Sequence, residues 1–186
     1  MKCSLKNEDR TLPLPKSGKK IALIGFIGSN AIVHGGGSGS VVPSSIATPL
    51  AGVTAVVGSM VTSYNGTEAT QAAAVATAAD IAVVFVGTYS QEGSDRTSLS
   101  LDDGGPANNQ NALIEAVAKA NPNTVVVVGT PGAILMPWSG SVKSILINFM
   151  PGQEAGNAVA DVLFGDLPAP WLNPVVTPFH AILTLF

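Results

Sequence analysis

The stretch that decides the fold is residues 81–101, IAVVFVGTYSQEGSDRTSLSL. Residues 81–86 are all apolar and mostly β-branched, without alternation of apolar and polar positions. Such a run is typical of a strand buried on both faces of a parallel sheet. Gly87 ends the run. Reactive polar groups follow at once: Tyr89, Ser90, Gln91, Glu92, Asp95 and Arg96.

Ligands of open α/β sheets bind beyond the carboxyl ends of the strands, so residues 88–101 form the best candidate site in the chain. The alternative is an ordinary surface loop, because loops are polar by default. In that interpretation Asp95 and Arg96 form a structural ion pair. The spacing of the residues alone leaves both interpretations open.

Strands and helices alternate along the rest of the chain. Apolar runs predict further strands at 20–25, 53–57, 124–128 and 142–148. Helices are predicted at 67–79, 108–120 and 152–164, the second of them from apolar residues at helical spacing. This order predicts an α/β fold: a three-layer sandwich with a mostly parallel sheet of five to six strands and helices on both faces.

The chain divides into three parts. Residues 1–19 are a linker-like lead-in, because the segment 12–15, LPLP, favours extended backbone. Residues 20–166 form the α/β-sandwich domain. Residues 167–186 are an atypical tail with four prolines and an uncharged apolar end, which needs a sheet edge or a second subunit to cover it.

The composition of the chain limits the kinds of partner that we expect it to bind. Only 11% of the 186 residues are charged, against about 25% in an average protein, so we expect a partner domain or another copy of the chain to cover part of the surface. A net charge of −3 without a basic patch argues against nucleic acid and anionic membranes. No apolar run is long enough for a membrane span, and no signal peptide is visible, so localisation stays unknown. One cysteine and two separated histidines predict no metal site, and no cofactor is expected.

A glycine-rich segment follows the first predicted strand. Gly25 and Gly28 lack the spacing of a dinucleotide-binding fingerprint, and no Lys-Ser/Thr pair completes a P-loop. Residues 35–40, GGGSGS, bring backbone N–H groups and hydroxyls together and could line a pocket for a neutral, hydroxyl-rich ligand. A flexible connector is the alternative.

Several stretches together resemble one family, the C-terminal α/β-sandwich domain of glycoside hydrolase family 3. They are KIALIG (20–25), GGGSGSV (35–41), AADIAVVFVG (78–87), EGSDRTSLSL (92–101), LIEAVAKANPNTVVVV (113–128), MPW (136–138) and PGQEAGNAVADVLFGD (151–166). SLKNEDRTLPLP (4–15) resembles the family's interdomain linker. The β-glucosidase type is the most similar.

The resemblance implies retaining hydrolysis of a terminal β-linked glucose by two carboxylates. An aspartate on a preceding (β/α)8 barrel is the nucleophile. Glu92, in Ser-Gln-Glu-Gly, matches the family's general acid/base, whose pKa has to be raised by partial burial in a cleft. The implied ligand is a β-glucoside or short oligosaccharide, and the family is often secreted or periplasmic.

The resemblance also suggests substrate-binding residues. The loop of Gly36, Gly37, Ser38 and Gly39 resembles one that borders the family's pocket, and Asp95 and Arg96 resemble an Asp-Arg step that shapes the catalytic loop. Trp138 is either a sugar platform or a buried residue at a strand end. Glu154 is expected to compensate the dipole at a helix start.

The chain departs from the family in two places. Nothing within it is long enough to form the barrel, so we expect a barrel domain or a second subunit to bring the nucleophile. Residues 167–186 do not match the family's closing segment. If the chain is active alone, its nucleophile would be Asp80, Asp95, Asp102 or Asp103. The alternative function is a non-catalytic carbohydrate-binding or interaction module.

Overall fold

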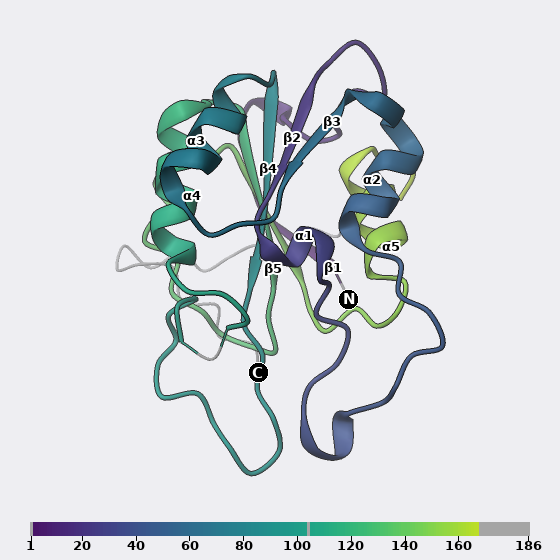
Figure 1. The fold of residues 1–186 in the computed structure, drawn as a ribbon, viewed down its shortest axis with the longest axis vertical. Helices are drawn as coiled ribbons and strands as arrows, with labels where there is room; N and C mark the ends of the chain where they lie inside the picture. Colours follow the sequence, from purple (N-terminus) through teal and green to yellow (C-terminus); the bar gives the residue numbers. More distant parts are fainter. Residues whose placement is uncertain (1, 104, 168–186) are drawn as a thin grey trace.

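The computed structural model describes residues 2–103 and 105–167, and it shows a six-stranded sheet between two layers of helices (Figure 1). The strands lie in the order β1-β6-β5-β4-β2-β3. Their bounds are β1 Lys2–Asn7, β2 Ile21–Ile24, β3 Val61–Tyr64, β4 Ile81–Gly87, β5 Thr124–Gly129 and β6 Ser144–Asn148. Strand β1 is antiparallel to β6, and all other pairs are parallel. The predicted fold class is confirmed.

Helices α2 (Pro49–Val57) and α5 (Ala155–Leu163) cover one face of the sheet, and α3 (Ala69–Thr77) and α4 (Gln110–Ala120) cover the other (Figure 1). The remaining helical pieces are short: α1 Phe26–Ser29 and 3-10 turns at Glu8–Arg10, Gly37–Gly39, Gly58–Met60 and Ser139–Ser141. None of the helices in the described part has the length and apolar character of a membrane span.

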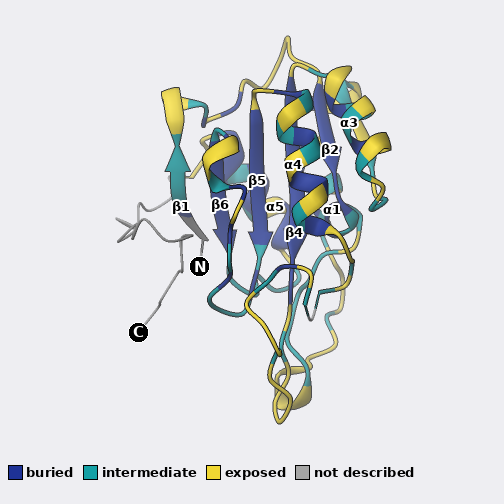
Figure 2. Cartoon of the chain, turned by 90° about the vertical axis from the view of Figure 1, so that its left-hand side faces the viewer, coloured by how far each residue is buried: buried dark blue, intermediate teal, exposed yellow. Residues whose placement is uncertain are grey.

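Strand β4 lies inside the sheet and is buried along its whole length (Figure 2). Successive side chains of a strand point to opposite faces. Ala82, Val84 and Val86 accordingly pack in the cluster under α3 and α4. Val83 and Phe85 pack in the cluster under α2 and α5. Both faces of β4 pack against apolar clusters, so its sequence does not alternate between apolar and polar residues. The sequence predicted a strand buried in this way.

The predicted strand at 53–57 is wrong, because these residues form the second half of α2. Thr48 and Pro49 start the helix: the Thr48 hydroxyl accepts from the Ala51 N–H at 3.2 Å, and Pro49 occupies the first turn. This start signal and the packing against α5 outweigh the strand preference of the β-branched residues. The strand that follows β2 in the chain is instead β3, a polar edge strand that the apolar pattern does not predict.

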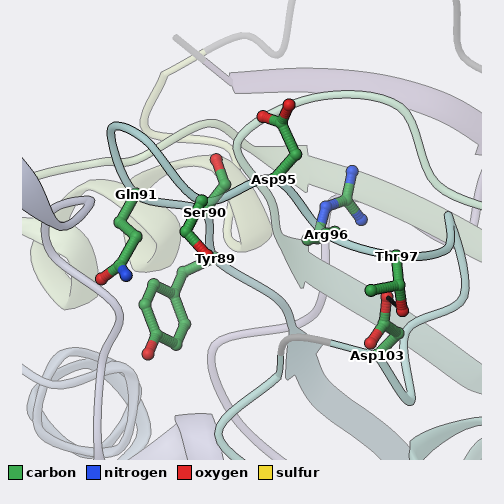
Figure 3. A pocket seen from close by; sticks show the side chains of 8 residues that line it. Tyr89, Ser90, Gln91, Asp95, Arg96, Thr97 and Asp103 are labelled. Carbon is green, nitrogen blue, oxygen red and sulfur yellow. Dashed lines mark hydrogen bonds between the residues drawn. The ribbon is translucent and has the colours of Figure 1, made fainter.

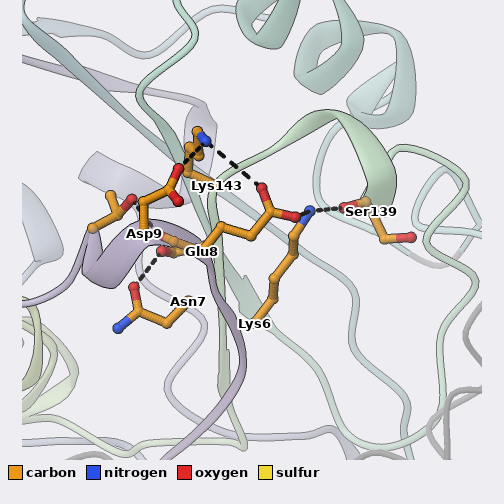
Figure 4. A network of polar contacts seen from close by, with 8 residues as sticks. Lys6, Asn7, Glu8, Asp9, Ser139 and Lys143 are labelled. Atoms are coloured by element: carbon orange, nitrogen blue, oxygen red, sulfur yellow. Dashed lines mark hydrogen bonds and ion pairs between the residues drawn. The ribbon is translucent and has the colours of Figure 1, made fainter.

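Part of the lead-in is not a free linker but belongs to the sheet. Strand β1 pairs with β6, and an ion-pair network follows it (Figure 4). Lys6 Nζ lies 3.0 Å from Glu8 Oε1 and donates to the Ser139 carbonyl at 2.8 Å. Lys143 contacts Asp9 at 2.5 Å. Beyond this network Leu12 and Leu14 are buried in the core under α2 and α5. Of the predicted tail 167–186, only Leu167 lies within the described residues.

Candidate active site

Two long loops meet beyond the carboxyl ends of the parallel strands. Residues 88–103 follow β4, residues 30–48 follow α1, and both extend past the lower end of the sheet in Figure 1. A bridge between Gly36 and Gln91 joins them, and the Gly36 N–H donates to the Ser90 carbonyl at 3.3 Å. The sequence-predicted site residues therefore come together at one edge of the sheet.

Gln110, the first residue of α4, anchors the base of the loop 88–103. Its side chain is 2% exposed. Its Oε1 accepts from the Gly87 N–H at 2.8 Å, and its Nε2 donates to the Gly87 carbonyl at 2.9 Å and to the Leu101 carbonyl at 2.5 Å. One buried amide thus holds both ends of the loop against the helix. This role could not be predicted, because a glutamine in a helix carries no signal of it in the sequence.

Three of the four candidate nucleophiles within the chain have structural partners. Asp102 accepts from the Gln110 N–H at 2.5 Å and from Asn111 Nδ2 at 2.9 Å. Asp103 accepts from the Ser98 N–H at 2.6 Å. Asp80 lies at the opposite edge of the sheet, before β4, where the Lys20 N–H donates to it and lowers its pKa. For Asp95 the described residues show no hydrogen bond or ion pair of its side chain.

A shallow cavity of about 160 Å³ opens on the loop of β4 (Figure 3). Its lining residues are Tyr89, Ser90, Gln91, Ser94, Asp95, Arg96, Thr97 and Asp103. Arg96 Nη2 donates to the Ala133 carbonyl at 2.7 Å, which ties the loop to the β5–β6 connection. The ion pairs of the described residues do not include an Asp95–Arg96 pair, so the structural pair weighed from the sequence does not form. Typical ligand pockets measure about 300–1,000 Å³, so this cavity is large enough for only part of a substrate.

Glu92 lies on the same loop but outside this cavity, on the side of the glycine-rich segment. It is exposed, and its Oε2 accepts from the Ser38 N–H at 2.9 Å. Hydrogen bonds from the Ser38 hydroxyl and backbone N–H lower the pKa of Glu92, because they stabilise the carboxylate. The family resemblance implies that burial raises the pKa of Glu92, but in the described residues this pKa is lowered.

The aromatic side chain at the cavity is Tyr89 and not Trp138. Trp138 is 1% exposed, and its Nε1 donates to Asn111 Oδ1 at 2.9 Å, so it is a core residue and no sugar platform. Tyr89 is 42% exposed on the cavity rim. Glu154 lies at the start of α5 as expected, where it accepts from Asn157 at 2.6 Å. The described residues contain no group of three potential metal ligands.

The fold and this loop define an α/β domain with a carboxylate-bearing rim, and comparison with known proteins gives its family. Residues 5–174 match the family described as "Glycosyl hydrolase family 3 C-terminal domain". The chain therefore belongs to glycosyl hydrolase family 3 and matches its C-terminal domain. In β-glucosidases of this family the domain normally accompanies a barrel domain.

The relatives that it matches are β-glucosidases. "Thermostable beta-glucosidase B" of Acetivibrio thermocellus is 38% identical over 178 residues, which cover 88% of this chain and 23% of that protein. The structure of a β-D-glucoside glucohydrolase from Trichoderma reesei is 31% identical with a TM-score of 0.76, covering 89% of this chain and 27% of that one. A β-glucosidase from Streptomyces venezuelae, solved with D-glucose, is 25% identical with a TM-score of 0.80, covering 88% and 35%. The chain thus spans about a third or less of these relatives.

Proposed function

We propose that this domain supplies Glu92 as the general acid/base of a retaining β-glucosidase, together with part of the sugar-binding site. The observation that carries the proposal is the position of Glu92: an exposed carboxylate in a Ser-Gln-Glu-Gly segment, on a loop beyond the carboxyl end of β4. The family and the β-glucosidase relatives support the reaction class.

The substrate in this proposal is a β-glucoside or short oligosaccharide. The cavity beside Glu92 offers hydroxyl, amide, carboxylate and guanidinium groups, with one exposed aromatic ring on its rim. Mixed donors and acceptors suit the hydroxyl groups of a neutral sugar, and an aromatic ring packs against its apolar face. Asp95 and Arg96 line this cavity. On the other side of the loop Gly36 lies against Gln91, and Gly37 and Ser38 lie against Glu92, with Gly39 next in the same segment.

A barrel domain or second subunit completes the site in this proposal. A general acid must hold its proton near neutral pH, and enzymes achieve this by burying the carboxyl group. Within the described residues Glu92 is exposed and its pKa is lowered. The nucleophile has to stand about 5–5.5 Å away for double displacement. A covering surface that carries the nucleophile would meet both requirements.

The decisive test uses a chimera in which residues 5–174 replace the matching segment of the Acetivibrio thermocellus enzyme. We expect the chimera to hydrolyse cellobiose, and Glu92→Gln to lower kcat/KM by about 10²–10⁴-fold, the usual size of general acid–base catalysis. Glu115→Gln is the matched control, because this exposed carboxylate lies in the middle of α4, outside the two loops. Equal activity of Glu92→Gln and the parent chimera would rule out the assignment.

The second candidate is a carbohydrate-binding module without chemistry, and the lowered pKa of Glu92 favours it. Calorimetric titration of the chain with cellobiose, together with the measured activity of the chimera, separates the two hypotheses. Millimolar binding together with a chimera that hydrolyses nothing supports the module. Loss of hydrolysis on Glu92→Gln supports the catalytic role whether or not the chain alone binds sugar.

A further inference from the structure

The glycine-rich segment touches the loop of Glu92 along three consecutive residues. Gly35 lies against the Ser90 carbonyl, Gly36 against Gln91, and Gly37 against Glu92. The closest polar contact follows directly, where the Ser38 N–H donates to Glu92 Oε2 at 2.9 Å. The two segments are 54 residues apart in the sequence, so this is a tertiary contact and no local turn.

The absence of side chains is what permits this approach. A Cβ on Gly36 would overlap the Cβ of Gln91, and a Cβ on Gly37 would lie 2.5 Å from the Cβ of Glu92. Gly37 also has a φ of 68°, which disfavours other residues, whereas Gly36 has an ordinary φ of −89°. Steric space alone therefore requires glycine at Gly36. Gly39, two residues beyond Gly37, faces open space.

We propose that the glycine-rich segment 35–38 is the positioning element of Glu92, with Ser38 as the residue that fixes its carboxyl group. This inference rests on the proposed function for its catalytic meaning, but its geometry does not depend on turnover. It also changes the role of the segment: Gly36, Gly37 and Ser38 act on the substrate through Glu92 and need not touch the sugar themselves.

The contact assigns different tasks to the two carboxyl oxygens. Oε2 accepts from Ser38, so Oε1 is the oxygen left to carry a proton toward a glycosidic oxygen. Once Glu92 has given up its proton, Ser38 stabilises the resulting carboxylate. In the second step of a retaining reaction this carboxylate takes a proton from the attacking water. Besides Glu92, the titratable or charged residues on the two loops are His34, Tyr89, Asp95, Arg96, Asp102 and Asp103. The lowered pKa of Glu92 arises from Ser38 and not from these groups.

The test is a ¹³C NMR titration of the Glu92 carboxyl group in the full chain. We expect Glu92 of the unmodified chain to titrate below the ordinary glutamate value. Ser38→Pro removes the backbone N–H that donates to Oε2, whereas Ser38→Ala removes only the hydroxyl and keeps this donor. Both changes should move the titration to higher pH, and Ser38→Pro should move it further. Gly36→Ala should push the loops apart and move it in the same direction, whereas Gly39→Ala should leave it unchanged.

Thermal unfolding of every variant shows whether it is folded, and a poorly folded Gly36→Ala leaves the two serine variants to decide. Equal titration of Glu92 in Ser38→Pro and Ser38→Ala would overturn the inference, as would an ordinary pKa in the unmodified chain. The catalytic proposal fails separately: an active chimera unaffected by Glu92→Gln removes Glu92 from catalysis while the titration still reports on Ser38.

Discussion

Replacing Gln110 by alanine should destabilise the domain and release the loop that carries the candidate site. Among the described residues, Gln110 is the one side chain that binds both Gly87, at the end of β4, and Leu101, near the end of the loop. Alanine keeps the helix, because its helix propensity is at least that of glutamine. The change therefore removes three hydrogen bonds and leaves backbone groups without partners in a buried position.

The size of the effect follows from those three contacts. A hydrogen bond contributes about 1 kcal/mol net, and a buried group left without a partner costs about 1–3 kcal/mol. Water can reach some of the freed groups once the side chain is gone, which reduces the loss. We expect a loss of about 3 kcal/mol in the free energy of unfolding, a large fraction of the roughly 5–15 kcal/mol that holds a domain together.

Urea denaturation followed by circular dichroism measures this loss. With a slope of about 2 kcal/mol per molar urea, the midpoint should fall by about 1.5 M. Gln71→Ala is the matched control, because Gln71 lies in α3 and is exposed, and it should shift the midpoint by little. A Gln110→Ala midpoint equal to that of Gln71→Ala would refute the claim that this amide anchors the loop.

Two further changes test the packing and the charge network. Gly52→Ala should destabilise the domain by about 2 kcal/mol, because overpacking costs about 1–3 kcal/mol. The new Cβ would overlap the Gly156 carbonyl, where α2 meets α5. Gly140 faces open space, so Gly140→Ala should be neutral in the same urea assay. The hydrogen bond and charge of Lys143 lower the pKa of Asp9 below 3.8, so the stability from this pair is present above that pH and is lost as the pH falls through the folded value. Unfolding curves between pH 5 and pH 2 should show a smaller acid loss in Asp9→Asn, and an unchanged loss would contradict the pairing.

The sequence predicted the elements that bury both faces and missed those whose place depends on distant contacts. Strand β4 is entirely apolar and β5 is apolar apart from Thr124, so composition alone located them. Strand β3 is polar and half exposed, and it exists because β2 pairs with it. Strand β1 likewise depends on β6, more than 130 residues later in the chain. Edge strands of this kind carry little hydrophobic signal, since only one neighbour defines them.

The place of the candidate loop in the fold could be predicted from the sequence, but the hydrogen bonds and the pKa of Glu92 could not. The end of β4 and the polar residues after it located the loop that the structure shows. The pairing of Ser38 with Glu92, and the lowered pKa that follows, depends on the approach of two loops that no local pattern encodes. The same holds for Trp138, whose burial depends on the packing of α4 and the contact with Asn111.

The exposure of Glu92 has a consequence for how such a domain works. An exposed carboxyl group with hydrogen-bond donors is ionised at neutral pH, so the described residues alone prepare a base and not an acid. Apolar side chains stand exposed on the same two loops: Val41 at 70%, Val42 at 89% and Tyr89 at 42%. Covering this edge would bury them and desolvate Glu92 together, which raises the pKa of a carboxyl group. In the proposed function, docking of the nucleophile-bearing domain is thus itself the event that turns Glu92 into an acid, and Ser38 keeps its carboxyl group oriented through that change.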